Sequence, residues 1–463
     1  MNNLFNLNSI LLGEDGKNFL LKNIIEKSDS FINSFLKKRE LVLFLCNNTL
    51  DSISLYVSFI NKSVVPILIN SDLEESLIRD IIEKYNPSYI FTPLNNQNYD
   101  FKYAEFLKYN SFLVFKARNY FETELNSELT ILLSSSGSTG SPKLIRISYK
   151  NLLSNAISIS NYLNLNSDEI AITNLPMSYS YGLSIINSHL YVGAKIVVTE
   201  KSLIQRDFWE LMKLNNVTSL SGVPYTYEIL KKIRFFKMDL PSIKYITQAG
   251  GKLSNSIIEE FAYHCKNKNI DFFIMYGQTE GTARLSYLNP DKIIEKLGSI
   301  GKPIPGGKFR LVSNSNKIIE SPNIEGELVY IGENVMLGYA NEKSHLSKGA
   351  ELNNSLYTGD LAYKDEEGYF FITGRKKRFI KIYGNRFSLD EIENHIKNNE
   401  IECACTGLDD KLKVFITDIS SEQKVKNVLK KLKIQKSAFK ILTTQILPKN
   451  SSGKVLYSKL KTG

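Results

Sequence analysis

The residues best suited to chemistry lie in one short loop that is rich in glycine and hydroxyl side chains. An apolar run at 129–133 precedes this loop, and a second apolar run at 144–147 follows it. Glycines let the backbone approach an anion closely, hydroxyl and main-chain N–H groups donate to phosphate oxygens, and a lysine adds a positive charge. We therefore expect the loop to bind phosphate through Ser135, Ser136, Gly137, Ser138, Thr139, Gly140 and Lys143.

Two other interpretations compete for this loop. Runs of Gly and Ser commonly form flexible surface segments without any ligand. The P-loop of nucleoside triphosphatases needs a second glycine directly before the lysine and a Ser or Thr directly after it. Pro142 and Leu144 stand at those two places, so the P-loop is excluded.

A second group of polar residues, Tyr276-Gly277-Gln278-Thr279-Glu280, follows the apolar run 271–275. Its aromatic ring could stack on adenine, and its glycine permits close approach of a ligand. Thr279 could donate to a phosphate or to a substrate carboxylate, and Glu280 is a hard oxygen ligand of the kind that Mg²⁺ prefers. The motif stands at the end of a predicted strand, where α/β sheets place their ligands.

Further candidates follow other predicted strands. Gly250 and Gly251 come after the strand 243–247, and paired glycines there give a ligand room. Asp360 ends the motif Tyr357-Thr358-Gly359-Asp360 and could accept both hydroxyls of a ribose. Lys454 follows Ser452-Gly453 near the C-terminus, and its charge would matter most where negative charge grows in a transition state. Taken singly, these residues are equally typical of turns and solvated surfaces.

The order of these motifs resembles that of the AMP-forming adenylating superfamily, which contains acyl-CoA synthetases, luciferases and peptide-synthetase adenylation domains. The resemblance is carried in order by 135–143, 276–280, 357–360, 380–386 and 447–454. It implies ATP-dependent activation of a small carboxylic acid to an acyl-adenylate, followed by thioester formation with CoA. Two alternatives stay open: transfer of the acyl group to the phosphopantetheine of an acyl carrier protein, and a catalytically silent adenylate-binding partner protein.

The resemblance also implies roles for single residues, with ATP, Mg²⁺ and CoA or phosphopantetheine as cofactors. Lys454, Thr279 and Glu280 are expected to take part in catalysis. Glu280 and Thr139 are expected to hold the metal ion. Besides the phosphate loop, the nucleotide and thiol are expected to contact Gly250, Gly251, Tyr276, Gly277, Gln278, Asp360, Arg375 and Lys381. The acyl pocket is expected at Tyr179, Gly182, Val223 and Met275.

The acyl segment 175–183 departs from the family pattern. Tyr179 stands where many acyl-CoA synthetases have histidine. Peptide-synthetase domains for α-amino acids carry an aspartate near this place, and the segment holds no acidic residue. Because a buried ammonium group without a carboxylate is costly, an α-amino acid substrate is disfavoured. A small to medium apolar or aryl acid is the expectation.

The elements that must position these residues alternate along the chain. Predicted strands at 40–46, 63–69 and 88–92 alternate with predicted helices at 49–61 and 73–85, which favours a parallel sheet covered by helices. Short alternating strands near 308–312 and 326–331 suggest a small antiparallel or barrel-like part. We predict an α/β protein: a large N-terminal domain (1–374) of two helix-covered sheets plus a small β-barrel-like subdomain, a hinge (375–377) with Lys377, and a small mobile α+β C-terminal domain (378–463). The shortness of that C-terminal domain slightly favours the carrier-protein alternative.

Composition sets broad limits. The 463 residues exceed one ordinary domain, and 43% hydrophobic with 23% charged residues is typical of a globular protein. No run of about 20 apolar residues exists, and the first residues lack the pattern of a secretion signal, so no membrane span and a cytoplasmic location are expected. The four cysteines show no zinc-ligand spacing. The net charge of +10 is spread along the chain, so we expect acidic substrates such as ATP and no nucleic-acid partner.

Overall fold

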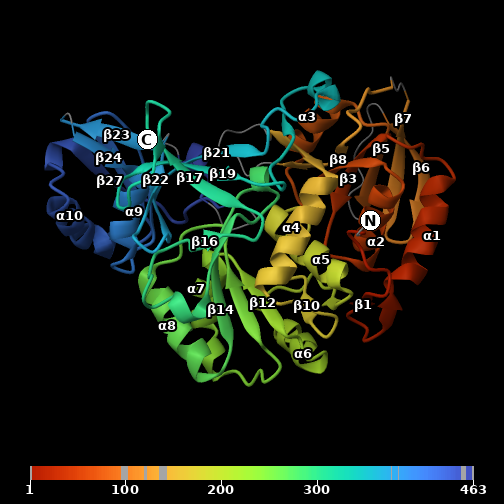
Figure 1. Cartoon of the computed structure of the whole chain (residues 1–463), viewed down its shortest axis with the longest axis horizontal. Coiled ribbons are helices and arrows are strands. Elements are labelled where there is room, and N and C mark those ends of the chain that lie inside the picture. Colours follow the sequence, from red (N-terminus) through yellow and green to blue (C-terminus); the bar gives the residue numbers. More distant parts are fainter. Residues whose placement is uncertain are drawn as a thin grey trace.

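The computed structural model describes residues 3–94, 103–118, 122–134, 143–376, 378–383, 385–449 and 455–460. Several predicted site residues lie outside these ranges, namely Ser135, Ser136, Gly137, Ser138, Thr139, Gly140, Lys377 and Lys454. Their roles therefore stay predictions. Figure 1 shows the described elements as two large sheets with their helices, a smaller antiparallel sheet, and a C-terminal group drawn in blue.

The first large sheet is mixed and carries the predicted phosphate loop at one of its hairpins. Strands β8, β4, β3 and β5 run parallel, while the outer strands pair antiparallel. Strand β3 is buried along its whole length, as its uninterrupted apolar sequence predicts for a sheet covered on both faces. In spatial order the strands are β20 (Gly338–Ala340), β9 (Leu144–Ser148), β8 (Leu129–Ser134), β4 (Val65–Asn70), β3 (Leu41–Cys46), β5 (Tyr89–Pro93), β7 (Phe112–Ala117) and β6 (Tyr103–Tyr109).

Helices α1 (Leu21–Asn33), α2 (Leu50–Asn61) and α3 (Glu75–Tyr85) accompany the first sheet. The predicted helix at 49–61 begins where Thr49 caps α2, because the Thr49 hydroxyl accepts the N–H of Ser52. The predicted strands and helices of this region are therefore present, with bounds that differ by one or two residues. The alternation did not indicate α1, nor the antiparallel outer strands.

The second large sheet places three predicted site segments at one edge. Its strands are, in order, β12 (Ser219–Gly222), β13 (Tyr245–Gln248), β14 (Asp271–Tyr276), β15 (Ser286–Leu288) and β16 (Lys302–Pro303). The first three run parallel, so their carboxyl ends lie at the same edge. Val223, Gly250 and Tyr276 stand at those ends, where α/β sheets bind ligands. Helices α6 (Arg206–Leu214), α7 (Pro224–Lys232) and α8 (Asn255–Asn267) share a hydrophobic core with this sheet.

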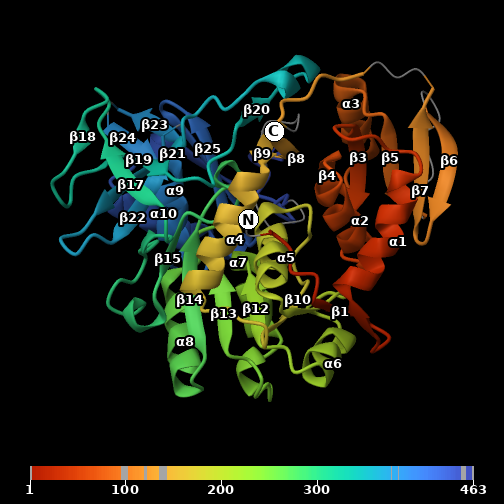
Figure 2. The ribbon, with the colours of Figure 1, turned by 45° about the vertical axis from the view of Figure 1, so that its right-hand side comes forward.

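Two helices, α4 (Tyr149–Tyr162) and α5 (Ser180–Val192), lie between the two large sheets (Figures 1 and 2). One hydrophobic core joins them to both sheets, since it contains Ile131 and Ile145 of the first sheet together with Tyr245 and Met275 of the second. Helix α5 begins at the segment for which the sequence predicted an acyl site. The acyl segment is therefore held by the main core of the protein.

Two smaller sheets complete the N-terminal part. Where a barrel-like subdomain was expected, five antiparallel strands form a sheet: β18 (Ile318–Ile319), β17 (Lys308–Val312), β19 (Gly326–Ile331), β21 (Ser355–Lys364) and β22 (Phe370–Arg375). A four-stranded sheet ties the start of the chain to the middle: β10 (Ile170–Ile172), β11 (Lys195–Val197), β1 (Ile10–Leu12) and β2 (Asn18–Leu20). The sequence analysis did not predict this four-stranded sheet.

The C-terminal part is α+β and has its own hydrophobic core. It comprises the hairpin β23 (Phe379–Ile382) and β24 (Asn385–Ser388), helix α9 (Leu389–Lys397), strands β25 (Cys403–Leu408), β26 (Lys411–Ile416) and β27 (Phe439–Thr443), and helix α10 (Glu422–Lys431). The mixed α/β architecture agrees with the predicted fold class, whereas the domain boundaries and the hinge stay predictions. None of the helices in the described ranges combines the length and apolar character needed to cross a bilayer.

Candidate nucleotide and acyl site

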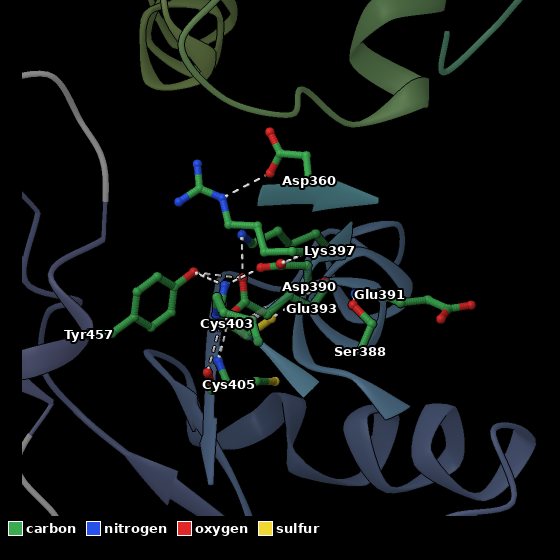
Figure 3. Close-up of polar contacts among 11 residues, drawn as sticks. Asp360, Ser388, Asp390, Glu391, Glu393, Lys397, Cys403, Cys405 and Tyr457 are labelled. Atoms are coloured by element: carbon green, nitrogen blue, oxygen red, sulfur yellow. Dashed lines mark hydrogen bonds and ion pairs between the residues drawn. The ribbon is translucent and has the colours of Figure 1, made fainter. Parts of the chain in front are cut away.

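Three residues predicted to hold adenosine are in direct contact. The hydroxyl of Tyr276 donates to Oδ2 of Asp360, and Nε of Arg375 lies 3.2 Å from Oδ1 of the same carboxylate. Asp360 and Arg375 face each other across the β21–β22 pair, which fixes this ion pair. Asp360 is buried, and Figure 3 shows its carboxylate reached by a guanidinium group. Burial, with a further contribution from Asp360, raises the pKa of Tyr276 well above its usual value, so the hydroxyl keeps its proton.

The predicted phosphate and metal residues are linked by a tyrosine that the sequence analysis did not select. Nζ of Lys143 lies 5.8 Å from the centroid of the Tyr339 ring. The hydroxyl of Tyr339 donates to Oε1 of Glu280 at 2.9 Å. Strand β20 brings Tyr339 to this place because it pairs with β9, directly after Lys143. Local sequence could not reveal this, because the contact depends on a pairing between segments far apart in the chain.

The residues between Tyr276 and Glu280 offer groups that a nucleotide could use. Thr279 is buried, and its hydroxyl lies 3.0 Å from that of Ser180 at the start of α5. Nε2 of Gln278 is buried and has no hydrogen-bond partner among the described residues. An unsatisfied buried donor is costly, so an acceptor on a bound ligand would relieve it. The carboxylate of Glu280 is a donor type that suits Mg²⁺, and these residues therefore fit MgATP.

The glycines of the predicted site are of two kinds, and only some of them stand beside residues of the predicted acyl pocket. At Gly250, where φ is +83°, an added Cβ would lie 2.6 Å from the Tyr179 hydroxyl and 3.1 Å from Val223. Two predicted pocket residues, Tyr179 and Val223, thus meet at Gly250, with Gly251 beside them. Gly182 and Gly277 have a different reason to be glycine. An added Cβ would lie 2.2 Å from the Pro176 carbonyl oxygen at Gly182, and 1.7 Å from that of Ala283 at Gly277.

Beyond these walls lies a buried arginine that the sequence analysis also missed. Arg284 donates through Nε to the Ser184 hydroxyl at 3.1 Å and through Nη1 to the Tyr162 hydroxyl at 3.0 Å. Its guanidinium carbon lies 5.0 Å from the centroid of the Tyr181 ring. Nη1 also lies 3.5 Å from the sulfur of Met275, a predicted pocket residue. One charged residue in the mostly apolar run after Glu280 was the available signal.

The predicted lysine loop of the C-terminal tail begins next to the first turn of α7. Lys449 and Val455 form an isolated antiparallel bridge that closes the loop at its base. Nζ of Lys449 lies 4.9 Å from the centroid of the Tyr225 ring, and Tyr225 lies in the first turn of α7, two residues after Val223. The same ammonium group pairs with Glu402 at 2.7 Å. The base of the loop that carries Lys454 is thus in contact with the N-terminal part.

A partly buried cluster ties this tail to the segment just after the predicted hinge (Figure 3). Arg378 donates through Nη1 to the Tyr457 hydroxyl at 2.9 Å and through Nη2 to Glu393 at 2.8 Å. The Tyr457 hydroxyl in turn donates to Glu393 at 3.0 Å. Asp390 accepts from Arg378 and, at 3.1 Å, from the main-chain N–H of Arg375. The hinge region, α9 and the tail are therefore one connected unit.

Lys381 is not brought to the nucleotide residues in this arrangement. Its main-chain N–H donates to Asp409 at 2.7 Å, and its carbonyl accepts from Asp410 at 2.7 Å, which ties the hairpin to the β25–β26 turn. Its side chain is exposed. Within the described ranges, no hydrogen bond or ion pair joins Lys381 to the N-terminal part. In the same ranges, no cluster of three or more His, Cys, Asp or Glu residues forms a metal site.

Residues predicted to bind a nucleotide lie at the carboxyl edge of a parallel sheet, with aromatic residues of the predicted acyl pocket beside them. This arrangement is typical of α/β enzymes that use a nucleotide. The family model of the AMP-binding enzyme matches residues 30–340, which is more than half of the chain. The chain therefore belongs to the AMP-binding enzyme family, and the predicted family is confirmed.

Similar proteins with assigned activities are acid–CoA ligases. A 2-succinylbenzoate–CoA ligase of Oceanobacillus iheyensis is 26% identical over 399 residues, which cover 82% of this chain and 79% of the relative. A protein of the same name from Bacillus mycoides is 24% identical over 456 residues, which cover 96% of this chain and 92% of the relative. The predicted enzyme class, an AMP-forming acid–thiol ligase, agrees with these names.

Solved structures confirm the predicted fold class. The o-succinylbenzoate CoA synthetase (MenE) of Bacillus subtilis, in complex with its acyl-adenylate intermediate OSB-AMP, superimposes with a TM-score of 0.81 at 21% identity, covering 98% of this chain and 95% of the other. An McyG A-PCP structure complexed with phenylalanyl-adenylate superimposes with a TM-score of 0.73 at 21% identity, covering 98% and 80%. At this level of identity the likeness concerns the fold.

Proposed function

We propose that the protein is an ATP-dependent, AMP-forming ligase that activates a carboxylic acid and transfers the acyl group to CoA. The observation that carries this proposal is that Tyr276 and Arg375 both contact the buried carboxylate of Asp360. Tyr276 stands at the sheet edge that also presents Glu280. The names of the relatives and their coverage of both chains support the acid–CoA step. 2-Succinylbenzoate, the acid in those names, is the first substrate to test.

In the first step, an oxygen of the acid attacks the α-phosphorus of ATP, the bond to the bridging oxygen breaks, and pyrophosphate leaves. Lys143, together with the loop Ser135–Gly140, would offset charge on the leaving phosphates. Glu280, with Thr139, would hold the Mg²⁺ ion, which supplies charge neutralisation at the phosphates. Lys454 would bridge the acid and the α-phosphate, where negative charge grows.

In the second step, the thiol of CoA attacks the acyl carbon and AMP leaves. We propose that the C-terminal domain turns about Lys377 between the steps, as a hinge motion. The contact of Lys449 with Tyr225 supports an orientation in which the Lys454 loop serves the first step. The hairpin with Lys381 would then reach the site only after the turn. The cluster of Arg378, Glu393 and Tyr457 would keep tail and hairpin moving as one body.

Two alternatives follow from the sequence. A carrier-protein phosphopantetheine could replace CoA as the thiol acceptor, since both present the same thiol arm. A silent adenylate-binding protein is disfavoured, because Lys143 and Glu280 are both held in place by Tyr339. A cytoplasmic location remains a prediction, and the four cysteines, all free and buried, are compatible with it.

ATP–pyrophosphate exchange over a panel of carboxylic acids tests the proposal. The panel would contain 2-succinylbenzoate together with aliphatic and aromatic mono- and dicarboxylic acids, and reactions without acid are the control. We expect exchange that depends on the acid, and a thioester when CoA is added. If no acid of the panel supports exchange, the proposal is contradicted and the silent binder is favoured. Exchange without CoA transfer, but with transfer to a carrier protein, would favour the other acceptor.

A further inference from the structure

Arg284 is a buried cation whose protein partners are all uncharged. Its side chain is buried, with 2% of the residue exposed. Among the described residues, its hydrogen bonds go to the hydroxyls of Ser184 and Tyr162 and to the sulfur of Met275. No ion pair of Arg284 occurs in the described ranges. A buried charge is costly unless an opposite charge accompanies it, so this position invites an anion.

The ionisable groups packed around Arg284 do not supply that anion. His189 of α5 donates from Nδ1 to the carbonyl of Ile185 at 2.8 Å, and its Nε2 accepts from the Tyr245 hydroxyl at 3.1 Å. Burial lowers the pKa of His189 to about 4, so it is neutral at pH 7. The buried carboxylate of Glu169 is already paired with Lys244 at 2.8 Å.

The tyrosines nearby are also neutral at pH 7. Burial raises the pKa of Tyr162 and of Tyr181. Burial also raises the pKa of Tyr245 above its usual value. Their hydroxyls and rings solvate the guanidinium but carry no charge. The positive charge of Arg284 is therefore left without a formal counter-charge in the described protein.

Arg284 borders the predicted acyl pocket through its contact with Met275. It touches Met275, which directly precedes Tyr276 in β14, and Tyr181, whose ring packs edge-on against Tyr179 at 6.2 Å. Tyr179 in turn stands over Gly250. The Nη2 group of Arg284 has no hydrogen-bond acceptor among the described residues, because its hydrogen bonds run from Nε and Nη1. An arginine fork of this kind matches a carboxylate in both geometry and charge.

We infer that Arg284 binds a second anionic group at the far end of the acyl substrate, so that the enzyme selects acids with two carboxylates or an equivalent anion. This inference rests on the proposed function and names the substrate class of the same site. It also accounts for the absence of an acidic residue in 175–183, because a pocket that ends in a cation repels an ammonium group.

Matched pairs of acids test the inference on the unmodified enzyme. 3-Benzoylpropionate keeps the succinyl arm and the ring of 2-succinylbenzoate but lacks the ring carboxylate, and hexanoate has a methyl group in place of one carboxylate of adipate. A site that must pair a buried group rejects an analogue without the partner by large factors. We expect the kcat/KM of ATP–pyrophosphate exchange to favour the dianionic member of a pair by about 10³-fold.

Substitution of Arg284 locates the selectivity. In Arg284→Met, the preference within a pair should fall below about tenfold, mainly through a higher KM for the dianion, whereas Arg284→Lys should keep part of it. Arg146→Met is the matched control, because Arg146 is equally buried but is paired with Glu351. It should change both acids of a pair alike. If Arg284→Met does not fold, Arg284→Gln and the wild-type pairs still decide.

The outcomes separate this inference from the proposed function. If no acid supports exchange, the proposed function is contradicted, and the inference with it. Exchange that is equal for both members of each pair would overturn the inference alone. The inference alone is also overturned if Arg284→Met keeps the full dianion preference.

Discussion

The nucleotide end and the acyl end of the candidate site treat charge in opposite ways. At the nucleotide end, the carboxylate of Asp360 is matched by Arg375, and Glu280 and Lys143 stand on either side of Tyr339. At the acyl end, Arg284 is surrounded by hydroxyls, a sulfur and aromatic rings. Protein groups hold the charges in place at the first end, whereas at the second end the partner must come from the ligand.

This difference suggests which part of the site is general and which part is specific. Residues for ATP come from strand ends and loops of several sheets, and they would serve any acid. The acyl end is built into the core between α4, α5 and β14, so a change of substrate requires repacking there. Substitutions at the two ends should therefore fail in different ways.

The largest effect is expected for Lys454→Ala. Loss of one group that meets developing charge typically costs about 10²- to 10³-fold in kcat, so ATP–pyrophosphate exchange should fall by about that factor. Thioester formation from a synthetic acyl-adenylate should largely survive, because that step needs no bridge to ATP. Equal loss in both assays would count against a lysine that serves only the first step.

Asp360→Ala should weaken ATP binding without changing the choice of acid. Hydrogen bonds to a charged group contribute about 1.5–3 kcal/mol, so the KM for ATP should rise about 10- to 100-fold. The control is Asp365→Ala on the same β21–β22 hairpin, where the carboxylate pairs with Lys296 at 3.1 Å. A similar rise of KM in the control, or a shifted preference between acids, would break the division between the two ends.

The acyl end should also make the protein sensitive to acid. The pKa of His189 is lowered by burial from 6.5 to about 4, so the unfolded chain binds its proton more readily than the folded one. The free energy of unfolding should therefore fall as the pH drops from about 6.5 to about 4, by about 2 kcal/mol at pH 5.

Urea unfolding at pH 7.5 and pH 5 measures this loss. In His189→Gln the loss between the two pH values should shrink by about 2 kcal/mol, because the titrating group is gone. His395→Gln on the exposed side of α9 is the control. An unchanged loss in His189→Gln would mean that another group controls acid stability.

The nucleotide end was far easier to predict from the sequence than the acyl end. Tyr276, Asp360 and Arg375 stand in short motifs, and the structure brings them together, although their roles stay proposals. Tyr276 and Arg375 end β14 and β22, whereas Asp360 lies within β21. Tyr339 and Arg284 were missed because their positions depend on pairing and packing between distant segments. Gly182 and Gly277 were assigned to ligands, while the structure gives each a neighbouring carbonyl as the reason for glycine.

The smallest effect, and the sharpest test of the nucleotide end, is expected for Tyr339→Phe. The substitution keeps the ring beside Lys143 but removes the hydroxyl that donates to Glu280 at 2.9 Å. Because Tyr339 is 38% exposed, water can replace the lost hydrogen bond, so its loss should cost about 1 kcal/mol, less than the loss of hydrogen bonds at the buried Asp360. The Mg²⁺ concentration for half-maximal exchange should therefore rise about fivefold, while the dianion preference stays as in the wild type.

Tyr357→Phe is the matched control for Tyr339→Phe, because Tyr357 is 55% exposed on β21. It should leave the Mg²⁺ dependence unchanged. Tyr339→Ala removes the ring as well, so it should raise the KM for ATP in addition, through the loss of the Lys143 contact. If Tyr339→Phe altered the preference between mono- and dianionic acids, the two ends would be coupled, and the charge at the acyl end could not be assigned to Arg284 alone.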